Sequence, residues 1–168
     1  SRAAWGRWQV GLTAPITLAA GQTDLTIDAG LYKPASLGNL VFCDANGNGV
    51  LDSCESGVSG VTVKLLNSTG SSVLATTTTN SAGQYSFTNL IPGVYEVQFV
   101  APSGTSFTAQ GKGYNNAIDS NPNASTGITG PITLSCGEND CTIDAGLIKT
   151  PNTAKSGDLR VKDSNHNG

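Results

Sequence analysis

The feature that most constrains the fold of this 168-residue chain is a long internal repeat. Residues 11–33 return at residues 127–149 with a constant offset of 116, and 15 of the 23 positions are identical. After a three-residue insertion the offset becomes 119, and glycine, leucine, aspartate and asparagine positions of residues 38–49 recur in residues 157–168. Self-similarity at a fixed spacing is the sequence signature of a structural unit that occurs more than once along a chain.

The repeat sets the predicted domain boundaries. Residues 1–33 are expected to be the C-terminal part of a preceding repeat, its final hairpin, and residues 37–149 one complete repeat. Residues 150–156 form a short polar linker, with residues 34–36 as its earlier counterpart, and residues 157–168 begin a following repeat with a first strand and a partial calcium loop. Linkers this short favour a stiff string of domains. We therefore expect neighbouring copies of the same repeat, in an array or fibre, to be the partners of this chain.

The complete repeat has the patterning of an all-β domain. Apolar and polar residues alternate with period two in several short runs, and no helical stripe of useful length appears. Turn signals rich in glycine, proline, serine and asparagine separate these runs. The pattern predicts a two-sheet, Greek-key-like β-sandwich with one half-buried face on each sheet. The alternating runs are residues 61–65, 85–87, 95–99 and 143–147.

Composition excludes several classes of function. The net charge is −3 and only 12% of residues are charged, so the chain has no basic footprint for nucleic acid. No apolar run approaches 18 residues, so no segment is expected to insert into a membrane. The only histidine is His166, and no Ser/His/Asp or Cys/His set exists. We therefore expect a protein that is not an enzyme.

One motif carries specific chemistry. Residues 44–55 fit the pattern D-x-[DN]-x-[DN]-G-x₅-E of a calcium-binding loop at every defined position. An Asn/Gly-rich turn would need neither of the two acidic residues that close the motif. Strand-like residues precede the loop and a glycine-containing segment follows it, so an EF-hand-type loop is grafted into a β-domain, where it suits a static, structural site. The predicted Ca²⁺ ligands are Asp44, Asn46, Asn48, the Val50 carbonyl, Asp52 and Glu55.

Two further oxygen-rich stretches are weaker candidates. Asp119, Asn121 and Asn123 alternate in a way that suits a second cation site, although a solvated turn explains the pattern equally well. The partial calcium loop near the C-terminus contributes Asp163, Asn165 and Asn167, which would be ligands awaiting an acidic second half.

The four cysteines admit three interpretations: two disulfides, a metal site or free thiols. Their spacings differ from the C-x-x-C pairs of zinc sites. Two of them align with Ala20 and Leu25 in the first copy, so both members of that pair are present or both are absent. This favours local disulfides, and hence an oxidising compartment, with unpaired thiols as the alternative. The predicted pairs are Cys43–Cys54 and Cys136–Cys141.

Several ordered motifs together resemble the B-repeat domain of serine-aspartate repeat surface proteins, the SdrD B-like family. They lie in residues 38–42, in the calcium loop and the segment that follows it to residue 63, and in residues 83–90 and 92–95. The resemblance implies a Cna-B-like, prealbumin-type sandwich, a calcium-rigidified stalk module and an extracellular or cell-surface location. Asn80 stands where this family often has Asp, and the cysteines are outside its usual pattern. Phe99 stands where related Cna-B domains would have the glutamate that promotes a Lys–Asn cross-link, so no isopeptide bond is expected.

These observations lead to one functional hypothesis and one alternative. The chain is expected to be a calcium-stabilised structural module, acting as a stalk, spacer or fibre subunit. The alternative is an adhesive module whose loops recognise a surface ligand.

Overall fold

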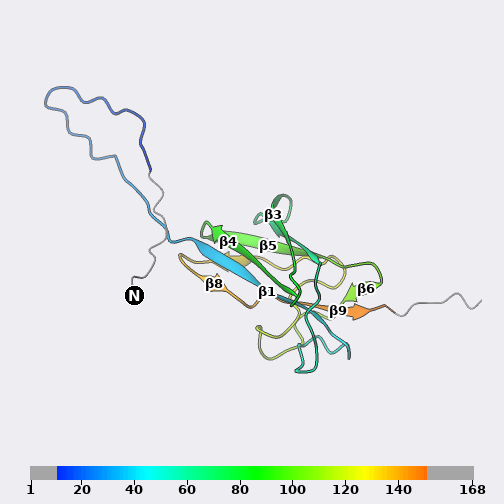
Figure 1. The fold of residues 1–168 in the computed structure, drawn as a ribbon. Helices are drawn as coiled ribbons and strands as arrows, with labels where there is room; N and C mark the ends of the chain where they lie inside the picture. Colours follow the sequence, from blue (N-terminus) through cyan, green and yellow to red (C-terminus); the bar gives the residue numbers. More distant parts are fainter. Residues whose placement is uncertain (1–10, 151–168) are drawn as a thin grey trace, which may run out of the picture. The chain divides into compact units, whose positions relative to one another are not determined.

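The computed structural model describes residues 11–150 of the chain (Figure 1). The chain divides into two units, Ser1–Leu31 and Tyr32–Gly168. In the first unit, residues 11–31 contain a turn but no strand. The second unit contains all of the described strands and the folded domain.

The domain is built from strands. Nine of them occur in residues 11–150, and that part of the chain has no helix of the length and apolar character needed to cross a bilayer. The strands are β1 (Ala35–Cys43), β2 (Thr62–Leu66), β3 (Val73–Thr78), β4 (Gln84–Leu90), β5 (Gly93–Val100), β6 (Thr105–Phe107), β7 (Ile132–Leu134), β8 (Asn139–Asp140) and β9 (Ala145–Lys149).

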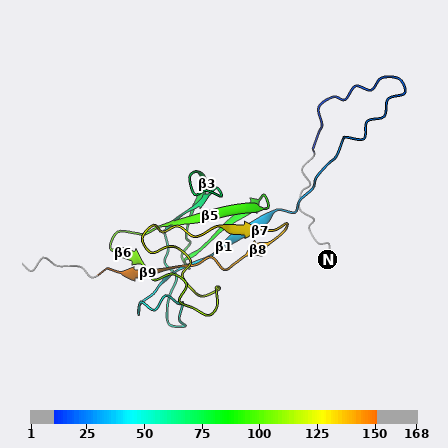
Figure 2. The ribbon, with the colours of Figure 1, turned by 180° about the vertical axis from the view of Figure 1, so that it is seen from behind.

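The strands form two sheets. One has the order β4-β1-β9-β6, with β8 also paired to β1, and the other has the order β3-β2-β5-β7. Figure 2 shows β5 and β7 side by side in one sheet and β6 beside β9 at the end of the other. The prediction of an all-β domain with two sheets is therefore confirmed.

Alternating apolar residues from both sheets meet in one core. Tyr85 and Phe87 of β4 and Phe99 of β5 are buried, and the Tyr85 ring packs edge-on against both phenylalanines, with centroids 6.1 and 5.5 Å apart. Such edge-to-face pairs add to the free energy gained by burying the rings. Aliphatic side chains of β1, β2, β5, β7 and β9, together with Val61 and Ile143, fill the rest of the core.

Two short strands, β8 and β9, run parallel to β1 and pair with its two ends. β8 pairs with the start of β1 at Ser36 and Leu37, and β9 pairs with its end at residues 41–43. The two strands are separated by residues 141–144, so the ladder along this edge of β1 is broken in the middle. The Asp144 carboxylate fills the break, because its Oδ1 accepts a hydrogen bond from the Leu40 backbone N–H (2.9 Å).

The structure differs from the predicted domain organisation at the first linker and at residues 127–149. β1 begins at Ala35, which is buried, so the first linker is shorter than residues 34–36. A final hairpin was expected for residues 1–33, and the equivalent residues 117–149 of the complete copy form none. β7 pairs with β5 in one sheet whereas β9 pairs with β1 in the other, so the segment crosses between sheets instead of pairing with itself. The predicted linker at residues 150–156 and the third copy at residues 157–168 lie, apart from Thr150, outside the described residues.

Candidate calcium site

The predicted calcium loop follows β1 directly and is held at several points. At its base, the Cys43 N–H donates to the Ser56 carbonyl (2.9 Å) and the Asp44 N–H donates to the Leu147 carbonyl of β9 (2.9 Å). Midway along the loop, Val50 and Asp119 form an antiparallel bridge. The loop is therefore anchored both to the β9 edge and to the segment around Asp119.

Asp44, the first predicted ligand, is almost completely buried at 1% exposure. Its Oδ1 accepts from the backbone N–H groups of Gly47 (2.7 Å) and Asn48 (3.2 Å), and its Oδ2 accepts from Gly49 N–H (2.8 Å) and the Thr108 hydroxyl (2.6 Å). Burial acts to raise the pKa of Asp44, but these hydrogen bonds outweigh it and hold the pKa below its ordinary value. Asp44 therefore remains a carboxylate at the bottom of the loop.

The other predicted side-chain ligands point toward one another. Asp52 Oδ2 accepts from the side-chain amides of Asn46 (2.8 Å) and Asn48 (2.9 Å). Glu55 reaches back across the loop, accepting from the N–H groups of Ala45 (2.8 Å) and Asp52 (3.1 Å). The fold therefore brings these loop residues together, and their role as calcium ligands stays a prediction.

The glycine at the sixth position of the loop is required by the backbone. Gly49 has a φ of 82°, and a Cβ there would lie 2.7 Å from the Ala109 carbonyl oxygen and 2.9 Å from two carbons of the Lys112 side chain. A side chain at this position would face both an unfavourable dihedral and a steric clash. The turn that brings the later ligands back toward Asp44 thus depends on glycine.

The donor set suits a hard cation. Calcium takes six to eight oxygen ligands, and the loop supplies three carboxylates and two side-chain amides. Within residues 11–150, no three His, Cys, Asp or Glu side chains form a metal cluster by themselves. A cation here would therefore also need the amide oxygens of Asn46 and Asn48 and the Val50 carbonyl.

The second predicted cation site is only partly assembled. Asn121 donates to Asp119 Oδ1 (3.4 Å), and burial raises the pKa of Asp119. Asn123 turns away, because its Oδ1 accepts from the backbone N–H groups of Ser125 (2.9 Å) and Thr126 (3.2 Å). The fold thus joins two of the three residues and uses the third to form a turn.

Two residues of this region were not identified from the sequence. Thr108 approaches Asp44 from 64 residues away, and no local pattern marks it. Asp144 is fully buried, and its burial raises its pKa to about 7, although hydrogen bonds from Leu40 and Asn39 oppose the shift. The repetition of Asp144 as Asp28, within a six-residue motif that recurs unchanged, was the available signal.

The cysteines lie where the local pairs were predicted, but all four are free thiols in the structure. Cys43 ends β1 just before the predicted calcium loop and Cys54 lies within the loop, whereas Cys136 lies in the turn before β8 and Cys141 directly follows β8. The Cys136 sulfur accepts a hydrogen bond from the Lys33 N–H (3.0 Å). The disulfide pairing stays a prediction.

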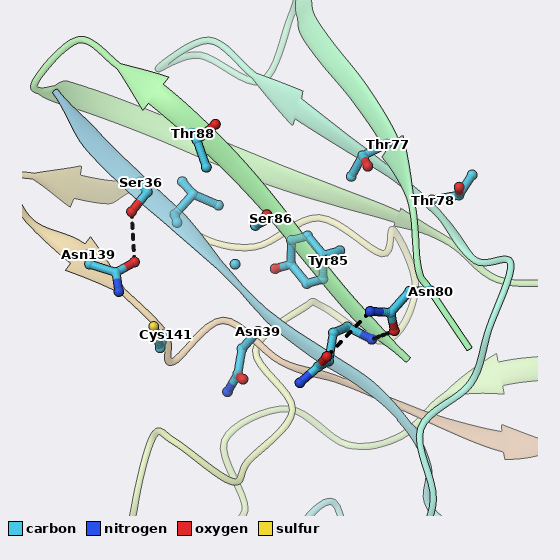
Figure 3. Close-up of a pocket in the computed structure, with 13 residues that line it drawn as sticks. Ser36, Asn39, Thr77, Thr78, Asn80, Tyr85, Ser86, Thr88, Asn139 and Cys141 are labelled. Carbon is cyan, nitrogen blue, oxygen red and sulfur yellow. Dashed lines mark hydrogen bonds between the residues drawn. The ribbon is translucent and has the colours of Figure 1, made fainter. Parts of the chain in front are cut away.

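A separate polar hollow lies beside β1 and β4, with a volume of about 470 Å³ (Figure 3). Ser36 donates to Asn139 on one side of it (2.7 Å), and Asn80 donates to Gln84 on the other (3.3 Å). No Asp, Glu, Lys or Arg is among its lining residues. These residues are Ser36, Leu37, Gly38, Asn39, Thr77, Thr78, Asn80, Gln84, Tyr85, Ser86, Thr88, Asn139 and Cys141.

Comparison with known proteins identifies relatives across most of the chain. Residues 35–147 match the family model described as the SdrD B-like domain. Serine-aspartate repeat-containing protein D of Staphylococcus aureus strain Newman is 43% identical over 150 residues, which cover 88% of this chain. Serine-aspartate repeat-containing protein F of Staphylococcus epidermidis is 40% identical over 144 residues, or 85% of this chain. The matches span 11% and 8% of these relatives, so the chain corresponds to about a tenth of their length.

Solved structures offer more distant matches. The minor pilin GBS52 of Streptococcus agalactiae is 15% identical with a TM-score of 0.46, and the match covers 71% of this chain and 46% of the pilin. The shaft pilin SpaA of Lactobacillus rhamnosus GG is 14% identical with a TM-score of 0.41, covering 71% and 50%. Both TM-scores are below 0.5, so the fold assignment follows from the strands and sheets of this chain and not from these structures.

Proposed function

Because the chain belongs to the SdrD B-like domain family, we propose that it is a calcium-stabilised structural module, a stalk, spacer or fibre subunit, of an extracellular or cell-surface protein. Its partners are neighbouring copies of the same repeat. The role is structural, not catalytic. The observation that carries the calcium part of the proposal is the convergence of Asp44, Asn46, Asn48, Asp52 and Glu55 in one loop.

The hydrogen bonds within the loop indicate how calcium would act. Asn46 Oδ1 and Asn48 Oδ1 accept from the N–H groups of Asn48 (2.9 Å) and Val50 (2.8 Å), and each amide oxygen has a second lone pair that could bind a cation. With Asp44 already ionised, the loop can then present oxygens from both of its halves to one cation. Binding would tie the start of the loop at the end of β1 to its end at Glu55, and so stiffen that end of the domain.

Melting of the whole chain with and without calcium tests the proposal. A ligand that binds only the folded state, at 100 times its Kd, stabilises it by about 2.7 kcal/mol. For a domain of this size we expect a rise in Tm on the order of ten degrees over the chelated protein. The matched control is Asp52→Asn with Glu55→Gln, which removes two charges from the loop. The proposal fails if calcium binds neither protein, or if the wild-type and control proteins melt alike with and without calcium.

We propose the two local disulfides as a further stabilising feature. Cys43–Cys54 would close the predicted calcium loop, and Cys136–Cys141 would close the segment that contains β8, each contributing roughly 2–3 kcal/mol in the chain-entropy account. Peptide mapping of the secreted protein without reductant is expected to recover these two pairs. Recovery of crossed pairs, or of four alkylated thiols, would contradict the assignment.

The polar hollow supports the alternative adhesive function. Its uncharged hydroxyl and amide groups suit a neutral ligand rich in hydrogen-bonding groups, such as a glycan. Glycan-array binding that is lost in Gln84→Ala and Thr88→Ala, but kept in the loop variant Asp52→Asn with Glu55→Gln, would favour it. Absence of binding by the wild-type chain would remove this alternative.

A further inference from the structure

Two Asn–Gly pairs follow one another in the loop after β1, at Asn46–Gly47 and Asn48–Gly49. Asparagine is among the chemically labile residues of proteins. In an Asn–Gly pair, the glycine nitrogen can attack the side-chain amide carbon of the asparagine before it, and glycine has no side chain to hinder the attack. Each pair is therefore a candidate for spontaneous deamidation.

The backbone of the loop requires both glycines. Gly47 has a φ of 72° and Gly49 a φ of 82°, in a region that residues with a side chain rarely adopt. A Cβ at Gly47 would meet no atom within 4 Å, so its dihedral angle alone calls for glycine. A bulkier residue after either asparagine would therefore slow the reaction only by straining the turn.

The two pairs differ in their access to solvent. Asn46, Gly47 and Asn48 are exposed, so a solvent base reaches the first pair directly. Gly49 is buried, and its carbonyl accepts a hydrogen bond from the Ser120 N–H (3.1 Å). The first pair is therefore the more accessible of the two.

One carboxylate holds both of the nitrogens that would attack. Asp44 Oδ1 accepts from the Gly47 N–H (2.7 Å), and Asp44 Oδ2 accepts from the Gly49 N–H (2.8 Å). Attack requires the glycine nitrogen to lose this proton, and the negative charge that forms would lie directly against the carboxylate. Because a like charge at this distance disfavours ionisation, Asp44 restrains the reaction at both pairs.

The asparagine side chains are also held, but more weakly. Their amide nitrogens both donate to Asp52 Oδ2 (2.8 and 2.9 Å), and their oxygens accept from the N–H groups of Asn48 (2.9 Å) and Val50 (2.8 Å). Ring closure needs each side chain to turn back toward the following nitrogen, which breaks these bonds. Hydrogen bonds between exposed neutral groups and their partners are easily exchanged for water, so the charge of Asp44 is the stronger restraint.

We propose that Asn46–Gly47 is a site of spontaneous deamidation whose rate is set by the Asp44 carboxylate, with Asn48–Gly49 as a slower second site. A solvent base takes the Gly47 N–H proton, the nitrogen bonds to Asn46 Cγ, and the side-chain amide takes up a proton and leaves as ammonia. Water then opens the resulting succinimide ring at either carbonyl and returns a proton to the nitrogen. Asparagine and water thus give ammonia and aspartate or isoaspartate, without an oxidant or reductant.

The modification would change the loop permanently. Each event adds a negative charge beside Asp52, and the isoaspartate form also moves a carbon atom from the side chain into the main chain. The reaction proceeds when the loop opens and the hydrogen bonds to Asp44 are lost, so the product accumulates as a record of local opening. The inference goes beyond the proposed function, because the reaction needs no calcium.

Ageing of the full chain in mildly alkaline buffer with chelator, followed by peptide mass spectrometry, tests the proposal. A synthetic peptide of residues 44–53 gives the rate without the folded domain. We expect the chain to deamidate at least about tenfold more slowly than the peptide, and at Asn46 before Asn48. Asp44→Asn should raise the rate at Asn46 by about tenfold or more. Asp144→Ala is the matched control, because it removes a buried carboxylate outside the loop, and it should react at a rate close to that of wild type.

Hydrogen exchange removes the same protons and needs no variant. In the wild-type chain, the Gly47 and Gly49 N–H groups should exchange at least about tenfold more slowly than in the peptide. If Asp44→Asn does not fold, this measurement and the order of the two sites decide. The proposal is wrong if the wild-type chain deamidates or exchanges as fast as the peptide, or if Asn48 reacts first. It is also wrong if folded Asp44→Asn reacts at the wild-type rate, or if Asp144→Ala accelerates the reaction equally. Calcium-dependent melting is a separate measurement, so the two proposals can fail independently.

Discussion

At the scale of single residues, the calcium loop is organised around a buried carboxylate. Asp44 is enclosed by four hydrogen-bond donors, three from the backbone of its own loop and one from Thr108. A buried charge is tolerated only when it is hydrogen-bonded in this way. The loop is therefore linked to the rest of the domain through a side chain that the calcium motif does not contain.

Replacement of Thr108 tests this link. Thr108→Val keeps the shape of the side chain but removes a donor to a buried carboxylate, so we expect the free energy of unfolding to fall by about 1–3 kcal/mol. Thr108→Ser retains the hydroxyl and serves as the control, with a smaller loss from the missing methyl group. Urea unfolding of both variants in chelator measures the effect. Equal stability of the two would show that the hydroxyl contributes nothing.

The residues of the loop differ in how far the sequence predicts them. Asp44, Asn46, Asn48, Asp52 and Glu55 could be predicted, because a calcium loop is formed by twelve consecutive residues and its spacing is local. Thr108 could not, because its position beside Asp44 is set by the pairing of β6 with β9. Asn123 was assigned to a cation site on its spacing alone, whereas its side chain caps a local turn.

At the scale of strands, the edge of β1 explains the buried Asp144. β8 and β9 pair with β1 on either side of a gap, and the carboxylate accepts from Leu40 N–H where a strand carbonyl would otherwise do so. The Asn39 side chain donates to its other oxygen (3.1 Å). A side chain therefore takes the place of one ladder bond.

Removing this carboxylate should weaken the domain. Asp144→Ala leaves the Leu40 N–H without its acceptor in the interior, and we expect a loss of about 1–3 kcal/mol in the free energy of unfolding. Asp144→Asn keeps one acceptor oxygen and should lose less. Thr133→Ala, at an exposed position of β7, is the surface control and should stay within about 0.5 kcal/mol of wild type. An Asp144→Ala variant as stable as the control would contradict the structural role.

Strands with strong alternation were the most predictable elements. β2, β4 and β5 each place apolar residues on one face over five or more positions, and their predicted positions were confirmed. β6 and β8 have only three and two residues, too few for a period of two to be recognised. The crossing of residues 127–149 between sheets also went unpredicted, because alternation shows which face is buried but not which strand lies alongside.

At the scale of the whole molecule, β1 and β9 determine how the domain transmits load. The two strands are parallel neighbours, and the chain enters at the start of β1 and leaves at the end of β9, at opposite ends of the sheet (Figure 1). A pull on the two ends of the domain therefore acts along the strands and loads the hydrogen bonds between them in shear. Bonds loaded in shear must break together, whereas bonds at a peeled edge break one at a time. Shear loading of these bonds is the mechanical arrangement that the proposed stalk under tension would require.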